Sequence, residues 1–316
     1  MMNIFLFPGQ SSVDPLSIVR AQRAHPATLA VADCARRVLG DARAKRYLDP
    51  AGAMLESNRD VQVTVFLATQ MYLAALAAEA VTAEHSVGLS LGEYSHLVHI
   101  GSLDLDAALG LVDERGRCYD TAPAGRMTTI LAVDREAVAT IVGRAEARGT
   151  VVISNYNART QHVIAGAADA VDWAAVQLEQ EYCAHTTVIE QRVPMHSPLM
   201  APVAQRFAPS LASAAFRPPV RAYRPNVTGA ALPGATREDI VSCLTRHVSE
   251  PVRWQDAIDG LVAEHPDAAF IEVGPGRALH NMMGRDWRKA RRLRIDAADQ
   301  ADPHEHFSAT VQALRA

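Results

Sequence analysis

The segment Gly88–Gly92, with the sequence GLSLG, places the strongest constraint on how this chain can fold. It follows the short apolar run 85–87 and precedes a stretch with helical spacing, so it predicts a tight turn from a strand into a helix. Side chains larger than hydrogen at 88 and 92 would collide with their neighbours in such a turn. Ser90 then projects at the helix N-terminus, where exposed backbone N–H groups favour a developing negative charge. This setting favours a nucleophilic serine over the alternative, a glycine-rich turn that carries an incidental serine.

The flanking segments predict an α/β layer with a parallel sheet, because strand-like and helix-like runs alternate along the chain. The strand-like runs cover 3–7, 85–89, 218–222 and 269–273, and the helix-like runs cover 26–39, 60–80, 104–119 and a stretch that begins at 91.

A different order of elements is expected between 126 and 192. Strand-like runs at 127–133, 150–155, 161–165 and 186–192 are separated by helix-like runs at 135–148 and 169–182. The resulting order β-α-β-β-α-β is typical of a small ferredoxin-like unit. We therefore predict a discontinuous large domain, 1–124 and 193–300, with a small ferredoxin-like domain, 125–192, inserted into it. The polar segment 301–316 is expected to be a loosely held C-terminal tail.

Charge and composition narrow the classes of function. The net charge of −4 argues against a general nucleic-acid-binding protein. No apolar run approaches the roughly 20 residues that a membrane-spanning helix requires, so we expect no membrane partner. The cysteines are far apart and form no CxxC pair, which predicts reduced thiols in a cytoplasmic protein and no metal site. They stand at Cys34, Cys118, Cys183 and Cys243.

A serine hydroxyl needs a base to take its proton. Among twelve histidines, His196 stands in a short segment stiffened by Pro194 and Pro198 directly after a predicted strand, which suits a positioned base. The alternative for His196 is a surface histidine. The oxyanion formed on attack needs two backbone donors, and we expect the N–H of Leu91 and an N–H from the turn at Gly9–Gln10.

These residues belong to a longer series of ordered motifs. The series comprises Phe7-Pro8-Gly9-Gln10, Gln62, Gly88–Tyr94, Glu114-Arg115-Gly116, Asn155-Tyr156-Asn157, His196–Met200, Pro251–Trp254 and Glu272–Gly276. In this order the chain resembles the malonyl-CoA:acyl carrier protein transacylases and the related acyltransferase domains of polyketide synthases. The resemblance runs from about Phe5 to Arg285.

The resemblance implies a fold, an activity and a set of roles. The large domain would be α/β-hydrolase-like with a parallel sheet, and the insert ferredoxin-like. The activity would be transfer of a malonyl group from coenzyme A to an acyl carrier protein through an acyl-enzyme on Ser90, with His196 as the base and no metal or other cofactor. Gln10 and Leu91 would supply the oxyanion donors. Substrate-binding residues would be Arg115, which pairs with the malonyl carboxylate, and Gln62, Asn157, Met195 and His247.

Arg115 suits a carboxylate because a guanidinium donates two parallel hydrogen bonds in one plane. Without the resemblance, the favoured interpretation would be a surface arginine paired with Glu114 or Asp113. The resemblance also implies that a backbone carbonyl near His247 orients His196.

The chain departs from the family pattern at three places. The family usually has glutamine or asparagine where His247 stands, and phenylalanine or serine where Met195 precedes the base. Ser11-Ser12 replaces a glycine or another small residue after Gln10. Met195 is expected beside the acyl α-carbon, where its flexible thioether could accept varied groups.

The basic segment 285–294 could bind an acidic carrier protein, and its alternative is a solvated basic face. Its cations are Arg285, Arg288, Lys289, Arg291, Arg292 and Arg294. Two other functions stay open: an acyl hydrolase that clears carrier proteins, and a non-catalytic acyltransferase-like docking subunit. The sequence also leaves open the acyl group, the fatty acid or polyketide pathway, the carrier protein and the oligomeric state.

Overall fold

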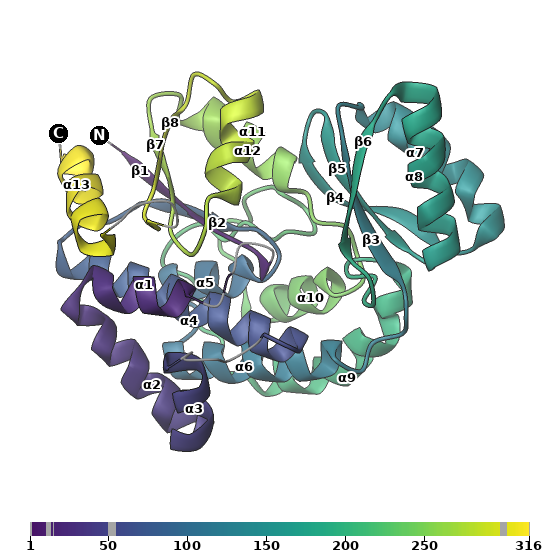
Figure 1. Cartoon of the computed structure of the whole chain (residues 1–316). Helices are drawn as coiled ribbons and strands as arrows, with labels where there is room; N and C mark the ends of the chain where they lie inside the picture. The colour runs from purple at the N-terminus through teal and green to yellow at the C-terminus, as the bar shows by residue number, and fades with distance from the viewer. Residues whose placement is uncertain (1, 11–13, 15, 50–54, 298–301, 316) are drawn as a thin grey trace.

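The computed structural model describes residues 2–10, 14, 16–49, 55–297 and 302–315, and it contains two separate four-stranded sheets (Figure 1). The first is parallel, with the order β2-β1-β7-β8. Its strands are β1 (Asn3–Phe7), β2 (His85–Gly88), β7 (Ala269–Glu272) and β8 (Arg291–Arg294). The predicted parallel sheet is confirmed. The fourth strand, β8, falls within the segment that the sequence analysis treated as a docking surface.

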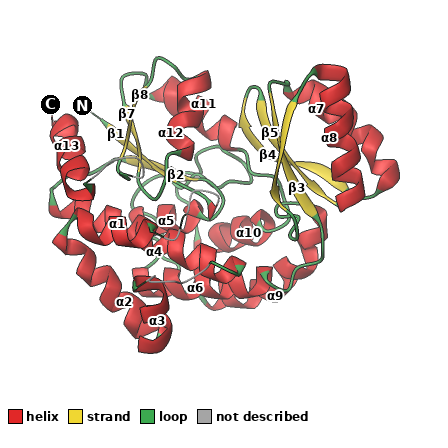
Figure 2. Ribbon diagram, in the orientation of Figure 1, coloured by secondary structure: helices red, strands yellow, loops and turns green. Residues whose placement is uncertain are grey.

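Successive side chains of β1 point to opposite faces of the parallel sheet, and both faces are buried. Ile4 and Leu6 pack with residues of α11 (Trp254–Glu264) and α12 (Ala278–Asp286). Phe5 and Phe7 belong to the larger core, which includes residues of α1 (Ser17–Ala24), α4 (Asn58–Ala78), α5 (Gly92–His99) and α6 (Leu105–Tyr119). Figure 2 shows this layer of helices below the strands. Because helices cover both faces, a site for polar groups is expected at the carboxyl ends of the strands.

The helix-like run predicted at 60–80 is α4. By length and composition it is the one helix of the described chain that could cross a membrane, and 72% of its most apolar window is buried inside the protein. Gly116 explains how closely α6 approaches it, since a Cβ at this position would lie 2.4 Å from the Cα of Arg59.

The second sheet is antiparallel, with the order β4-β5-β3-β6. Its strands are β3 (Arg126–Leu131), β4 (Val151–Ala158), β5 (Gln161–Gly166) and β6 (His185–Glu190). The helices α7 (Arg135–Ala145) and α8 (Ala168–Tyr182) cover its outer face (Figure 1). The predicted order β-α-β-β-α-β is confirmed. The two ends of this unit lie side by side. The N–H of Gly125, at its start, donates to the carbonyl of Arg192, at its end, at 2.9 Å.

The remaining helices complete the layer around the parallel sheet. They are α2 (Leu29–Leu39), α3 (Asp41–Leu48), α9 (Ala201–Ser213), α10 (Arg237–His247) and α13 (Pro303–Arg315), with short 3₁₀ turns at Pro26–Thr28 and Pro198–Met200. A further 3₁₀ turn, Glu146–Arg148, follows α7 in the antiparallel unit.

Two sequence predictions are wrong. Segment 218–222 is not a strand: its neighbour Arg217 donates to the carbonyl of Ser102 and Val220 donates to that of Ile100, while the two prolines at 218 and 219 offer no N–H for a ladder. The C-terminal segment is not loosely held either. Within the described range 303–315 it is a helix that contacts α1 and buries Phe307 and Val311.

Glu272 sits at the end of β7, fully buried, and its carboxylate accepts the N–H groups of Leu279 (3.1 Å) and His280 (2.8 Å) at the start of α12. Burial nevertheless raises the pKa of Glu272 to about 7. A raised carboxyl pKa means that this group's contribution to stability is complete below its unfolded-state pKa and is lost as the pH rises through 7.

We therefore expect Glu272→Gln to gain stability relative to the unchanged chain as the pH rises. From pH 5 to 8.5 the difference in free energy of unfolding should grow by about 2 to 3 kcal/mol, measured by urea denaturation. The free energy of unfolding of the variant must be compared with that of the unchanged chain at each pH, because other groups also change stability with pH. Burial lowers the pKa of His96 to about 3 and that of His99 to about 4, and these histidines change stability in the opposite direction over this range. A difference that does not change with pH would contradict the expectation.

Candidate active site

Ser90 lies in the turn that the sequence predicted between β2 and α5. Its φ is +51°, a left-handed conformation that non-glycine residues rarely adopt. The flanking glycines are required by space: a Cβ on Gly88 would lie 2.0 Å from the carbonyl carbon of Gly92, and a Cβ on Gly92 would lie 2.2 Å from the carbonyl oxygen of Phe7. The turn therefore holds the Ser90 side chain in one direction, at the carboxyl end of the parallel sheet.

His196 meets this hydroxyl from the loop that follows the antiparallel sheet. Its Nε2 lies 2.7 Å from Oγ of Ser90, and its Nδ1 lies 2.7 Å from the carbonyl oxygen of His247. A carbonyl can only accept, so Nδ1 carries the proton and Nε2 is left as the acceptor for the serine hydroxyl. This is the tautomer that a general base needs.

The protonation state of His196 follows from its surroundings. The residue is 2% exposed. Burial, the neighbouring His247 ring and the Arg115 guanidinium lower the pKa of His196 well below its ordinary value. The imidazole is therefore neutral, and able to accept a proton, across the physiological pH range.

The two predicted oxyanion donors flank the nucleophile. Gln10 and Ser90 both line the same cavity, and Leu91 directly follows Ser90. Among the described residues, the backbone N–H groups of Gln10 and Leu91 have no intramolecular acceptor. Both are thus available to an incoming oxygen atom. Ser11 and Ser12, which depart from the family pattern, lie outside the described residues.

The cavity beside Ser90 has a volume of about 390 Å³ and lies between the two sheets. Residues from the parallel-sheet layer line one side, and β3 to β6 line the other. The lining consists of Gly9, Gln10, Leu55, Val61, Leu89, Ser90, Met127, Asn155, Asn157, Val163, Ile189, Glu190, Met195 and His196. Asn157 and Met195 are thus brought to the site as predicted, and the Oδ1 of Asn157 is buried without a partner within the described chain.

Arg115 is buried at 1% exposure behind the cavity rather than in its lining. Its Nη1 donates to Oε1 of Gln62 at 2.7 Å, and its guanidinium lies 4.2 Å from the ring centre of Tyr119. The other terminal nitrogen, Nη2, has no hydrogen-bond partner among the described residues. A buried guanidinium with a free donor can receive an anionic group.

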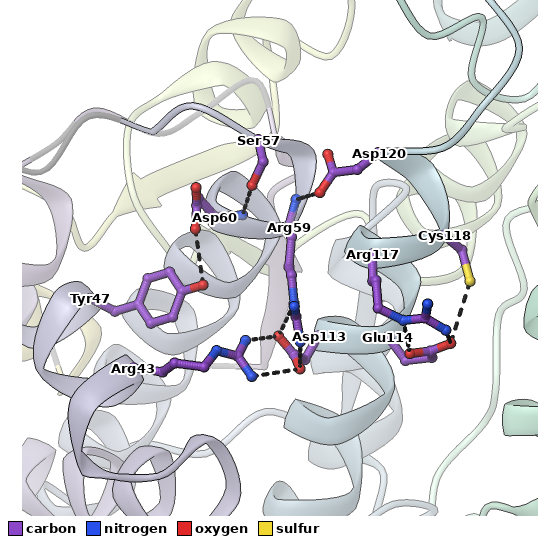
Figure 3. Close-up of polar contacts among 10 residues, drawn as sticks. All are labelled: Arg43, Tyr47, Ser57, Arg59, Asp60, Asp113, Glu114, Arg117, Cys118 and Asp120. Carbon is purple, nitrogen blue, oxygen red and sulfur yellow. Dashed lines mark hydrogen bonds and ion pairs between the residues drawn. The ribbon is translucent and has the colours of Figure 1, made fainter.

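The neighbouring acids do not pair with Arg115, so the surface-arginine interpretation is wrong. Figure 3 shows Asp113 held by Arg43 and Arg59, and Glu114 held by Arg117. These arginines hold the pKa of Asp113 and that of Glu114 below their ordinary values.

The basic segment does not form one open surface. Arg285, Arg288 and Lys289 are exposed, whereas the arginines of β8 are half-buried. Arg291 donates to the carbonyl of Ala313 in α13, and a Cβ on Gly284 would lie 3.1 Å from the guanidinium of Arg292.

Two residues near the dyad were not assigned by the sequence analysis. Asn226 accepts the N–H of Ser90 at 2.8 Å and donates to the carbonyl of Gly88 at 2.7 Å, so it clasps the turn. Glu93 is fully buried with its Oε2 3.0 Å from Nδ1 of His247. No spacing pattern identifies Asn226. Glu93 could have been noticed as an acid in the first turn of the helix that follows Ser90.

Comparison with known families decides which kind of site this is. The model of the acyl transferase domain family matches residues 18–301. The chain belongs to this family. The serine and histidine brought together here therefore stand in an acyl transferase domain.

Curated relatives of this acyl transferase domain are named as malonyl CoA-acyl carrier protein transacylases or as polyketide biosynthesis proteins. The malonyl CoA-acyl carrier protein transacylase of Haemophilus influenzae is 34% identical over 64% of this chain and 65% of its own length. The polyketide biosynthesis protein ThaF of Burkholderia thailandensis is 31% identical over 89% of this chain but only 24% of its own length. The malonyl CoA-acyl carrier protein transacylase of Bacillus subtilis is 27% identical over 98% of this chain and 96% of its own length. This chain thus spans about two thirds of the length of the Haemophilus influenzae protein and about a quarter of the length of ThaF.

Solved structures share the fold of this acyl transferase domain. The malonyl CoA-acyl carrier protein transacylase of Clostridium perfringens matches with a TM-score of 0.90 and 24% identity, over 100% of this chain and 98% of that one. The likeness supports an α/β fold with a parallel and a second, antiparallel sheet. Within the described residues, no group of three or more histidine, cysteine, aspartate or glutamate side chains could hold a metal ion.

Proposed function

We propose that this acyl transferase domain moves a malonyl group from coenzyme A to the phosphopantetheine thiol of an acyl carrier protein, through an ester on Ser90. The contact of 2.7 Å between Oγ of Ser90 and Nε2 of His196 carries the proposal. The names of the curated relatives support the substrate and the carrier protein.

The proposed reaction has two matching halves. Ser90 attacks the thioester carbon while its proton passes to Nε2 of His196, and the carbonyl oxygen becomes an oxyanion that accepts the N–H groups of Gln10 and Leu91. The carbon–sulfur bond then breaks, and coenzyme A leaves as a thiol with the proton from His196. In the second half, the carrier thiol gives its proton to His196 and its sulfur attacks the ester carbon; the carbon–oxygen bond then breaks, and Ser90 leaves as a hydroxyl with the proton from His196. These steps require no metal and no redox cofactor.

Intact-mass spectrometry after mixing with malonyl-CoA tests the proposal. We expect one malonyl adduct on Ser90, which disappears when an acyl carrier protein with its phosphopantetheine arm is added and reappears on that protein. Adduct that is lost to water faster than to the carrier would favour the acyl hydrolase, and complete absence of adduct would favour a non-catalytic docking subunit. Acetyl-CoA and methylmalonyl-CoA in parallel samples identify the acyl group.

Finer assignments of architecture belong to the same proposal. The strand order β4-β5-β3-β6 supports a ferredoxin-like small domain at 125–192, and the strand–turn–helix at Ser90 supports an α/β-hydrolase-like large domain at 1–124 and 193–300. We place the protein in the cytoplasm and assign it neither a nucleic-acid nor a membrane partner.

Carrier binding yields a separate prediction. Replacing the exposed cations Arg285, Arg288 and Lys289 with glutamine should raise KM for the carrier protein by about fivefold to tenfold, because rim charges steer an acidic partner. KM for malonyl-CoA should stay unchanged. The matched control replaces Arg36 and Arg37, exposed arginines of α2, which pair with Asp33 and Asp106. Equal changes in both KM values would refute docking at this segment.

A further inference from the structure

Glu93 is a buried carboxylate that contacts three residues on two other segments. It stands in the first turn of α5, three residues after Ser90, where the helix N-terminus favours negative charge. Its Oε1 accepts the hydroxyl of Tyr223, and its Oε2 lies 3.0 Å from Nδ1 of His247 and 3.4 Å from the N–H of Asn226. All three neighbours are able to donate, so the carboxylate is a hub that joins α5 to the end of α10 and to the loop at 223–226.

His247 touches His196 in two ways. Its carbonyl oxygen accepts from Nδ1 of His196, and its ring stacks on the ring of His196 with centroids 4.8 Å apart and an interplanar angle of 16°. Because Nδ1 of His247 is engaged with Glu93, the position of the His247 ring depends on that carboxylate. Its Nε2 is buried without a hydrogen-bond partner among the described residues. The contact with Glu93 therefore anchors this side chain.

Asn226 connects the same carboxylate to the nucleophile. Its backbone N–H faces Glu93, while its side chain accepts from the N–H of Ser90 and donates to the carbonyl of Gly88. Glu93 is therefore linked to the base through His247 and to the turn that carries the serine through Asn226.

We infer that Glu93 and His247 form a buried positioning pair that sets the distance and orientation between Ser90 and His196. The inference rests on the proposed acyl-transfer function and adds two residues that act through others, without touching the substrate. It also assigns a consequence to the histidine at 247, where the family usually has an amide. An imidazole stacked on the base influences its charge, which an amide cannot do in the same way.

The electrostatic surroundings of His196 fix the direction of that influence. From α6 it faces the Arg115 guanidinium, from α10 the His247 ring, and from the turn the Ser90 hydroxyl, while Glu93 lies behind His247. Arg115 and His247 both disfavour a positive charge on His196. Removing the His247 imidazole takes away one of these influences, so the pKa of His196 should rise.

The test compares Glu93→Gln and His247→Gln, with Glu114→Gln as control because Glu114 pairs with Arg117 on α6 away from the dyad. We expect Glu93→Gln to lower kcat by about 10- to 100-fold, since small misplacements of reacting groups are costly, while KM for malonyl-CoA changes little. We expect His247→Gln to keep the backbone carbonyl contact and to move the acid limb of the kcat/KM profile to higher pH. Thermal melting of each variant reports whether the fold is kept.

Nitrogen-15 NMR of the His196 ring supplies a readout that does not need activity. Nδ1 should be the protonated nitrogen in the unchanged chain and in His247→Gln, with a higher titration midpoint in the variant. An unchanged midpoint in His247→Gln, together with an unchanged kcat in Glu93→Gln, would overturn the positioning role. Failure of the unchanged chain to form an adduct with malonyl-CoA would instead refute the proposed function, and the NMR comparison would still decide the inference.

Discussion

Replacing Ser90 with alanine should abolish the malonyl adduct and lower kcat/KM by about 10⁴-fold or more, as loss of a serine nucleophile does when only the binding and oxyanion groups remain. The reason is chemical: alanine offers no oxygen for the ester, while the turn, the cavity and the His196 imidazole stay in place. Intact-mass spectrometry and initial rates with malonyl-CoA measure both quantities.

Ser95→Ala is the matched control for this change. Ser95 is also buried and lies in α5, the helix that follows the nucleophile, so the substitution removes one hydroxyl at comparable burial. This variant should retain the adduct. An adduct that persists in Ser90→Ala would show that another side chain carries the acyl group.

Replacing Arg115 with alanine should lower kcat/KM for malonyl-CoA by about 10²- to 10³-fold, because the malonyl carboxylate would lose a buried charged partner. Acetyl-CoA has no carboxylate, so its kcat/KM should change only a few-fold. The ratio of the two rates, measured side by side, is the decisive quantity, since a general loss of folded protein would lower both rates equally.

Two further variants separate charge from geometry at this position. Arg115→Lys keeps the charge but loses the planar pair of donors, and we expect an intermediate ratio. Arg117→Ala removes an exposed arginine two residues along α6, which is paired with Glu114, and should leave the ratio unchanged. If Arg115→Ala affected malonyl-CoA and acetyl-CoA equally, Arg115 would serve the fold rather than substrate selection.

The sequence predicted what short segments determine. The turn at Ser90 rests on five consecutive residues, and the two glycines are needed because backbone atoms of the same turn and of β1 occupy the space beside them. The β-α-β-β-α-β order also follows from local periodicity. In the same way, Phe307, Val311 and Leu314 recur at the spacing of a helix face, a signal that the interpretation of 301–316 as a loose tail overlooked.

Long-range contacts were beyond such patterns. His196 is 106 residues from Ser90, so local sequence could only name it as one candidate base, and the resemblance to a family joined the two. Asn226 reaches back 136 residues to the N–H of Ser90, and no periodicity marks an asparagine in a loop for that role. Segment 218–222 was misjudged for a related reason. A short strand was predicted, but the N–H groups of Arg217 and Val220 are used by carbonyls of the loop after α5.

Both members of the dyad have left-handed backbone conformations, with φ of +51° at Ser90 and +61° at His196. Each such residue costs about 1–3 kcal/mol, and it persists only while the surrounding contacts enforce it. Local relaxation of these two loops releases that cost without exposing either sheet, so it needs less free energy than global unfolding. On gradual warming, the acyl-transfer activity should therefore be lost while the circular dichroism is still that of an intact protein, and cooling should restore the activity.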